Sequence, residues 1–141
     1  MSDTISTLPY TRDILRLAAA VPGRVAFGEL RDATELRSRT CGSRAAVAVE
    51  LDGAGRVAAF SQAVEACAYG QAAAALMGAR AIGLTLAEAE AQRAAVEAWL
   101  AGGAMPDWLA PLAPALDRTG RHQAILLPFR ALVAAMRKAA A

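Results

Sequence analysis

Two cysteines and a single histidine are the side chains of this sequence best suited to metal or sulfur chemistry: Cys41, Cys67 and His122. Thiolates and imidazoles bind zinc and iron, and a thiolate is also the nucleophile of sulfur transfer. Two thiols are too few for a disulfide framework. These three donors are one short of a closed tetrahedral zinc site, so a fourth ligand would be a carboxylate, water or a partner's group. The alternative is that each cysteine is only a small buried apolar residue.

The segment between the two cysteines predicts a β-hairpin. Apolar side chains alternate with others over residues 44–51, which is typical of a half-buried strand. Residues 52–55, Asp-Gly-Ala-Gly, predict a turn, and residues 56–64 predict the returning strand. Cys41 precedes the first strand and Cys67 follows the second. Because the outer ends of an antiparallel hairpin lie side by side, we expect the two thiols to be neighbours.

Helical patterns dominate the chain outside this hairpin. Thr85 and Glu88 have the spacing of a capping box at the start of one helix. Pro128 lies inside the last helical pattern, so we expect that helix to begin or bend there. Cys67 stands at an expected helix N-terminus, where the helix dipole favours a thiolate. The expected helices cover residues 9–20, 68–79, 85–101 and about 120–139, and a polar edge strand is expected over residues 33–40.

The order of these elements predicts an α+β fold with segregated helices and strands. In this fold a small three-stranded antiparallel sheet packs one apolar face against the three later helices. That face is expected to carry Val47, Val49, Leu51, Val57 and Phe60. A length of 141 residues fits one domain over residues 1–141.

Composition and charge exclude several classes of function. A net charge of +2 gives no reason to expect a nucleic-acid partner, and Arg37, Arg39 and Arg44 are either a docking patch or a solvated edge. Charged residues interrupt each apolar run before it reaches the roughly 20 residues of a membrane span. The N-terminus has no secretory signal pattern, so we expect a cytoplasmic protein. No phosphate loop is present and no nucleophile elbow surrounds Ser43, so the sequence does not predict an enzyme.

Five segments together resemble a known family. Residues 10–17, followed by Pro22-Gly23-Arg24, resemble its opening helix and the Asn-Pro-Arg-Asn segment after that helix. Residues 40–43, Thr-Cys-Gly-Ser, resemble its Cys-Gly-Asp motif, and Ala66-Cys67 with the following small-residue helix resembles its Gly-Cys segment. Residues 83–89 resemble its Gly-Lys-Thr-x-x-Glu-Ala helix start. Residues 121–132 resemble its final Arg-x-x-Cys-x-x-Leu-x-Trp-x-Ala-Leu helix. In this order and spacing, the chain resembles the iron–sulfur cluster assembly scaffolds of the IscU and NifU N-terminal type, and their SufU-like branch in particular.

The resemblance implies a ligand set that this chain retains only in part. The family supplies three cysteines and an aspartate to an iron–sulfur cluster or a zinc ion. Cys41 and Cys67 carry over as metal ligands and persulfide acceptors. Ser43 replaces the aspartate and is a poorer metal ligand, which makes it a vestigial position or one that supports the ligands.

The third cysteine of the family is also missing. Its position falls at Ala124 in a gapless alignment, or at Gln123 after a shift of one residue. His122 lies beside both positions and is the candidate third ligand. A [2Fe–2S] cluster usually takes four protein ligands, so this reduced set implies weak binding or a ligand supplied by a partner or by a second protomer in a homodimer.

The function implied by the resemblance is that of a non-catalytic scaffold. Such a protein binds iron, a [2Fe–2S] cluster or zinc and hands it on, with a cysteine desulfurase and recipient apo-proteins as partners. A second reading is a thiol sulfur carrier and desulfurase partner of the SufU-like kind. A third is a divergent paralogue that kept the fold, binds no metal and acts as an interaction module.

Overall fold

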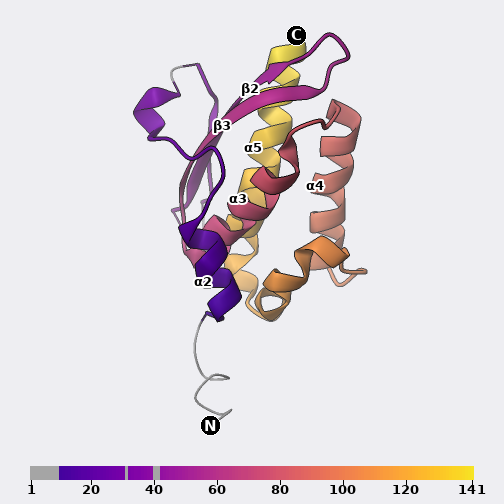
Figure 1. Cartoon of the computed structure of the whole chain (residues 1–141). Helices are drawn as coiled ribbons and strands as arrows, with labels where there is room; N and C mark the ends of the chain where they lie inside the picture. Colours follow the sequence, from indigo (N-terminus) through magenta and orange to yellow (C-terminus); the bar gives the residue numbers. More distant parts are fainter. Residues whose placement is uncertain (1–9, 31, 40–41) are drawn as a thin grey trace.

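A three-stranded antiparallel sheet forms one side of the molecule, as predicted from the sequence (Figure 1). The computed structural model describes residues 10–30, 32–39 and 42–141. The strands, in spatial as well as sequence order, are β1 (Glu35–Arg37), β2 (Arg44–Leu51) and β3 (Val57–Glu65). β1 is therefore shorter than the edge strand expected over residues 33–40, whereas the hairpin strands match their predicted bounds closely.

The hairpin of β2 and β3 has the predicted turn at its tip. The Asp52 carboxylate accepts the backbone N–H groups of Ala54 at 2.9 Å and Arg56 at 3.0 Å. Gly55 adopts a φ of +76°, a conformation that glycine reaches without steric cost. These contacts hold the pKa of Asp52 below its ordinary value, chiefly through the N–H of Arg56. The turn closes the hairpin, and a register shift between Glu50 and Leu51 separates it from the regular pairing that continues to Arg44 and Glu65.

The helices also follow the sequence expectations. Thr85 and Glu88 form the predicted capping box: Thr85 Oγ1 accepts the Glu88 N–H at 3.2 Å, and the Glu88 carboxylate accepts the Thr85 N–H at 3.0 Å. The α-helices are α2 (Arg12–Ala19), α3 (Ala68–Ala81), α4 (Leu86–Leu100) and α5 (His122–Ala140). The short 3₁₀ helices are η1 (Phe27–Glu29), η2 (Asp107–Ala115) and η3 (Thr119–Arg121).

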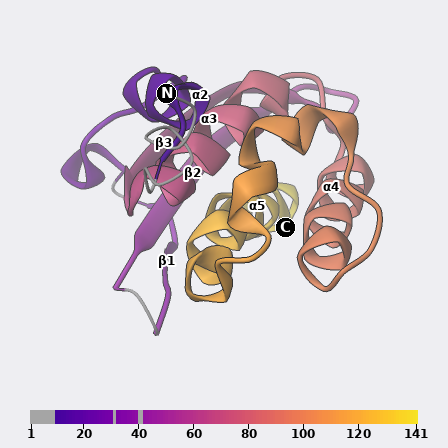
Figure 2. The same cartoon turned by 90° about the horizontal axis from the view of Figure 1, so that it is seen from below.

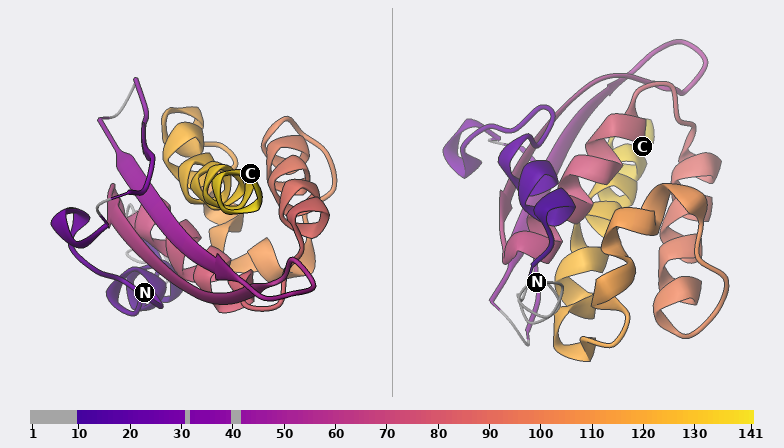
Figure 3. Two further views of the ribbon diagram at one scale, coloured as in Figure 1. Left: turned by 90° about the horizontal axis from the view of Figure 1, so that it is seen from above. Right: turned by 60° about the horizontal axis from the view of Figure 1, so that its bottom comes forward.

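Helix α5 is the centre of the helical layer. It lies on the sheet, mainly on β2, while α3 packs against both β3 and α5 (Figures 2 and 3). Helix α2 packs on α3. The sequence placed the helix of residues 85–101 on the sheet as well, but α4 packs mainly against α5. The reason is that α5 is apolar on most of its circumference and needs cover on the side away from the sheet.

Helix α5 begins at His122, close to the expected start at about residue 120, so of the two alternatives for Pro128 a start at the proline is wrong. Pro128 has no N–H, so the Ala124 carbonyl lacks its usual helical donor. The four residues that precede the proline, Ala124 to Leu127, are buried. Their burial stabilises the first turns of the helix despite this missing hydrogen bond.

The segment between α2 and η1 is fastened to β3 by Gln62. The Gln62 backbone N–H donates to Gly23 O at 2.9 Å, and its carbonyl accepts the Val25 N–H at 2.8 Å. Its buried side-chain amide donates to Pro22 O at 2.8 Å and to Ala74 O at 3.1 Å. Gln62 therefore joins this segment, the sheet and α3, and sets the position of the residues around Arg24.

Candidate functional site

The register of the hairpin brings together the two chain segments that lead to the cysteines. Arg44, the first residue of β2, pairs with Glu65, the last residue of β3. Cys67 follows Glu65 by two positions, and Cys41 precedes Arg44 by three. Cys41 lies outside the described residues, so the proximity of the two sulfur atoms stays a prediction.

Cys67 is the N-cap residue of α3. Its backbone is extended, with φ −62° and ψ 171°, and its side chain makes no capping hydrogen bond. Cys67 is free and half-buried, and it packs at the margin of the hydrophobic core. A half-buried cysteine at a helix N-terminus has the location required of a metal ligand or a sulfur acceptor.

Ser43 closes the connection between β1 and β2. Its carbonyl accepts the Ser38 N–H at 2.8 Å, and only 3% of its surface is exposed. A residue packed in this way supports the fold at the base of the hairpin.

His122 stands at the start of α5 and contacts the end of η2. Its Nε2 atom lies 3.2 Å from Ala115 O and 3.0 Å from Leu116 O. Because carbonyl oxygens only accept, Nε2 carries the proton and donates it to them. In the neutral ring Nδ1 is then the nitrogen with a free electron pair, and any ligation by His122 would use Nδ1. A ring N–H held by a backbone carbonyl is a common way of orienting a ligating histidine.

The two positions aligned with the missing third cysteine differ in environment. Gln123 is exposed, and its side-chain oxygen accepts a hydrogen bond from Arg130 at 3.1 Å. Ala124 is buried and faces α3, where a Cβ built on Gly70 would lie 3.2 Å from the Ala124 Cβ. Gly70 is one helical turn beyond Cys67, so the inward-facing position 124 is beside the Cys67 turn of α3.

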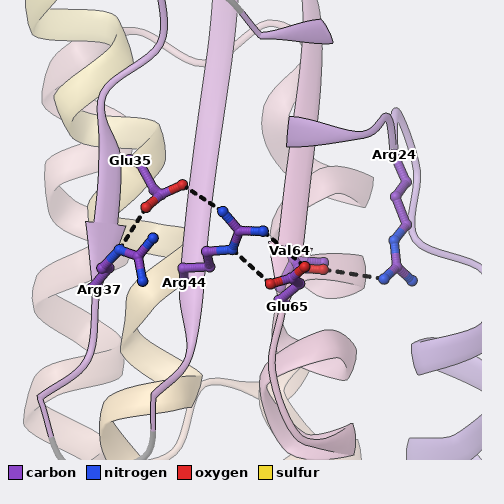
Figure 4. A network of polar contacts seen from close by, with 6 residues as sticks. All are labelled: Arg24, Glu35, Arg37, Arg44, Val64 and Glu65. Carbon is purple, nitrogen blue, oxygen red and sulfur yellow. Dashed lines mark hydrogen bonds and ion pairs between the residues drawn. The ribbon is translucent and has the colours of Figure 1, made fainter. Parts of the chain in front are cut away.

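An ion-pair network joins all three strands at the cysteine end of the sheet (Figure 4). Arg44 binds Glu65 through two hydrogen bonds of 2.6 and 2.8 Å and binds Glu35 at 2.9 Å. Glu35 also binds Arg37 at 2.6 Å. The Arg44 guanidinium further stacks over Phe27, 3.8 Å from the ring centroid.

This network changes the charge of the site. The Arg44 guanidinium holds the pKa of Glu65 below its ordinary value, mainly by hydrogen bonding, and the two carboxylates raise the pKa of Arg44. Arg37 and Arg44 are therefore neutralised by neighbours and do not form a free basic docking patch. The Arg44–Glu65 pairing depends on the register shift between Glu50 and Leu51, so the predicted turn alone does not indicate it.

Arg24, for which the sequence shows no functional signal of its own, connects two elements at this end of the sheet. It donates to Val64 O at 3.1 Å and to the Gln71 side-chain oxygen at 3.3 Å. Gln71 in turn donates to Ala66 O at 2.9 Å, next to Cys67. This chain of hydrogen bonds holds the first turn of α3 against β3 and so positions the thiol.

The described donors do not by themselves make a metal centre. Within residues 10–30, 32–39 and 42–141, no three His, Cys, Asp or Glu side chains gather closely enough to hold a metal ion. A site at this end of the sheet would need Cys41 and groups from outside the described part of the chain. What the described residues provide is one free cysteine, held in place by the ends of β3 and α3.

The fold is that of the NifU-like N-terminal proteins. Along its whole length the chain is similar to the N-terminal nitrogen-fixing NifU-like protein from Brucella abortus, with 28% identity and a TM-score of 0.82. That similarity covers 99% of this chain and 96% of the other. The resemblance to the IscU, NifU and SufU-like family predicted from the sequence is thereby confirmed.

A second solved structure shares the fold. It is a putative iron–sulfur cluster assembly scaffold protein for the SUF system from Fervidobacterium islandicum AW-1, with a TM-score of 0.73 and 20% identity. The match covers 90% of this chain and 96% of the other. No protein-family model and no curated protein sequence matches the chain.

In the part of the chain that the structure describes, none of the helices has the length and apolar character needed to cross a membrane.

Proposed function

We propose that this protein is a non-catalytic iron–sulfur assembly scaffold that carries iron, a [2Fe–2S] cluster or zinc as cargo and passes it on. The observation that carries the proposal is the likeness of the whole chain to a NifU-like protein at a TM-score of 0.82. A cysteine desulfurase and recipient apo-proteins are the partners of such a function, and the cytoplasm is its proposed location. The proposal treats residues 1–141 as one domain.

Cys41 and Cys67 are the proposed principal ligands. The pairing of Arg44 with Glu65 supports this assignment, because it joins the strand ends that lead to both thiols. His122 is the proposed third ligand, through Nδ1, since Nε2 donates to the end of η2. Ser43, Gln123 and Ala124 are proposed to support the site without ligating. A fourth ligand would come from a partner or a second protomer.

Metal analysis of the purified full chain, followed by anaerobic reconstitution with iron and sulfide, tests the proposal. We expect bound metal and visible charge-transfer absorption in the wild type. Cys41→Ser and Cys67→Ser should each abolish both, because two remaining donors cannot hold a cluster. Ser61→Ala, in the middle of β3 and paired with Ala48, is the control and should retain them. A wild-type protein without metal or charge-transfer absorption would contradict the scaffold function.

A sulfur carrier is the second candidate, favoured by the free and half-buried Cys67 at the start of α3. Its thiolate would attack the outer sulfur of a desulfurase persulfide. A new S–S bond forms on Cys67, the donor's S–S bond breaks, and the donor leaves as a thiolate.

Alkylation competition separates the two candidates. Rapid alkylation of Cys67 near neutral pH, unchanged by added zinc, supports sulfur transfer, whereas protection by zinc supports the scaffold. If the protein is instead an interaction module that binds no metal, replacing both cysteines by serine would leave partner binding intact.

A further inference from the structure

Residues 24–30, which contain η1 and which we call the strap, are loosely held against the sheet. The strap projects from the side of the sheet that faces away from α5 (Figures 1 and 3). None of its residues is buried. A groove of about 630 Å³ lies between the strap and the sheet, lined by Phe27 on one side and by Val64 and Glu65 on the other. Few buried contacts therefore hold the strap, which is typical of segments that open locally.

The middle of the strap is tied to the sheet by one cation–π contact. In the described part of the chain, the hydrogen bonds of residues 26–30 stay within residues 26–33. The Arg44 guanidinium lies over the Phe27 ring, 3.8 Å from its centroid. Arg44 in turn holds the Glu65 carboxylate through hydrogen bonds of 2.6 and 2.8 Å. The contact thus connects the strap to a residue two positions before Cys67.

The base of the strap is tied to the same junction between β3 and α3. Arg24 donates to Val64 O at 3.1 Å and to the Gln71 side-chain oxygen at 3.3 Å. Gln71 donates to Ala66 O at 2.9 Å. Together with the Phe27 contact, these bonds hold each of the three residues that precede Cys67. The strap therefore cannot leave the sheet without releasing the residues that position this cysteine.

Gly23 provides the point about which the strap turns. Its φ of +68° is a conformation that glycine adopts without steric cost. Its carbonyl accepts the Gln62 N–H at 2.9 Å, and a Cβ atom at this position would lie 3.1 Å from the Phe60 ring. Gly23 is thus fixed on β3. When the strap moves, the backbone loses the 2.8 Å bond from the Val25 N–H to Gln62 O.

We propose that the strap is a conformational switch for Cys67. When the strap is docked, the junction between β3 and α3 is held and Cys67 stays half-buried. When it is displaced, the junction is released and the thiol is exposed to reagents and partners. The inference rests on the proposed function for the importance of Cys67, but its test needs neither metal nor partner, so either proposal can fail without the other.

Alkylation of Cys67 by iodoacetamide in the full chain carrying Cys41→Ser tests the switch. At about pH 10, above the ordinary thiol pKa of about 8.5, the rate reports how often the thiol is exposed. Phe27→Leu removes the ring, and we expect the rate to rise about two- to fivefold, the effect of losing one exposed cation–π contact. Phe27→Tyr keeps the ring and should keep the wild-type rate. Equal rates in these two variants would overturn the proposal.

Leu100→Ala controls for a general loss of stability. Leu100 is half-buried on α4, which packs mainly on α5, so this variant should leave the alkylation rate unchanged. A rise equal to that of Phe27→Leu would overturn the switch.

Hydrogen exchange at the Val25 amide gives the reverse measurement. Because coupling between two sites acts in both directions, alkylation of Cys67 should speed exchange at Val25 by about two- to fivefold. Unchanged exchange at Val25 would show that the strap and the thiol are independent, and would overturn the proposal.

Discussion

Gly70 of α3 lies against Ala124 of α5, so closely that a Cβ atom on Gly70 would be 3.2 Å from the Ala124 Cβ. The same atom would be 2.6 Å from the Ala66 Cβ, beside Cys67. This contact joins the thiol-bearing turn of α3 to the place where the family's third cysteine aligns without a gap. Because Ala66, Gly70 and Ala124 are all small, α3 and α5 can pack this closely.

Restoring a thiol at position 124 should therefore strengthen metal binding. Ala124→Cys adds a third thiolate donor near Cys67, and we expect zinc affinity to rise by about tenfold or more. Gln123→Cys is the control, because Gln123 is exposed and contacts Arg130 instead. Competition titrations with a chromophoric chelator measure both affinities, and thermal unfolding checks that both variants fold. A larger gain at position 123 would favour the alignment shifted by one residue.

The same contact predicts a packing cost for Gly70→Ala. Alanine favours a helix over glycine by about 1 kcal/mol, but overpacking a tight contact costs about 1–3 kcal/mol. We expect a net loss of stability in urea unfolding. In the double variant Ala66→Gly/Gly70→Ala the 2.6 Å contact disappears, so the loss should be smaller than the sum of the single variants. Additive effects would show that Ala66 does not limit the space at Gly70.

The sequence was sufficient for the hairpin and for the order of elements. Alternating residues over 44–51 and a turn rich in glycine specify the two strands, because each feature depends only on neighbouring residues. The register shift between Glu50 and Leu51 has no such local signal and was not predicted. The Thr85–Glu88 capping box is local in the same way.

Features that depend on contacts between distant segments could not be predicted from the sequence. The partners of His122 are backbone carbonyls at the end of η2. Every residue has a backbone carbonyl, so the sequence cannot indicate which one His122 contacts. The placement of α4 depends on how much of α5 the sheet leaves uncovered. The Gly70–Ala124 contact needs the helix packing itself, because alanine and glycine are common throughout this chain.

The Arg44–Glu65 pair makes stability depend on pH. The Arg44 guanidinium lowers the pKa of Glu65 in the folded chain, so the pair stabilises the fold above the ordinary carboxyl value of 4.5. This contribution is lost as the pH falls below 4.5 through the lowered pKa, because protonated Glu65 no longer pairs with Arg44. Urea unfolding between pH 7 and pH 3 should therefore show a shallower acid loss in Glu65→Gln. Glu50→Gln, on the exposed face of the same hairpin, is the control. Identical pH profiles for wild type and Glu65→Gln would contradict the role of the pair.

Two buried glutamines should respond in opposite ways to replacement by methionine, which has a similar volume. Gln62 is 1% exposed and donates to Pro22 O and Ala74 O, whereas both polar side-chain atoms of Gln92 are buried without a partner in the described structure. Gln62→Met leaves the Pro22 carbonyl without its donor, and we expect a loss of about 1–3 kcal/mol.

Gln92→Met removes buried polar atoms that form no hydrogen bond, so its stability should stay equal to that of the wild type or rise by up to about 2 kcal/mol. Urea unfolding of both variants gives the two values under the same conditions. Because the chemical change is identical, any difference between them measures hydrogen bonding at the two positions. A similar loss in both variants would mean that Gln92 has a partner in solution, whereas no loss in Gln62→Met would remove the proposed link between the Pro22 segment, β3 and α3.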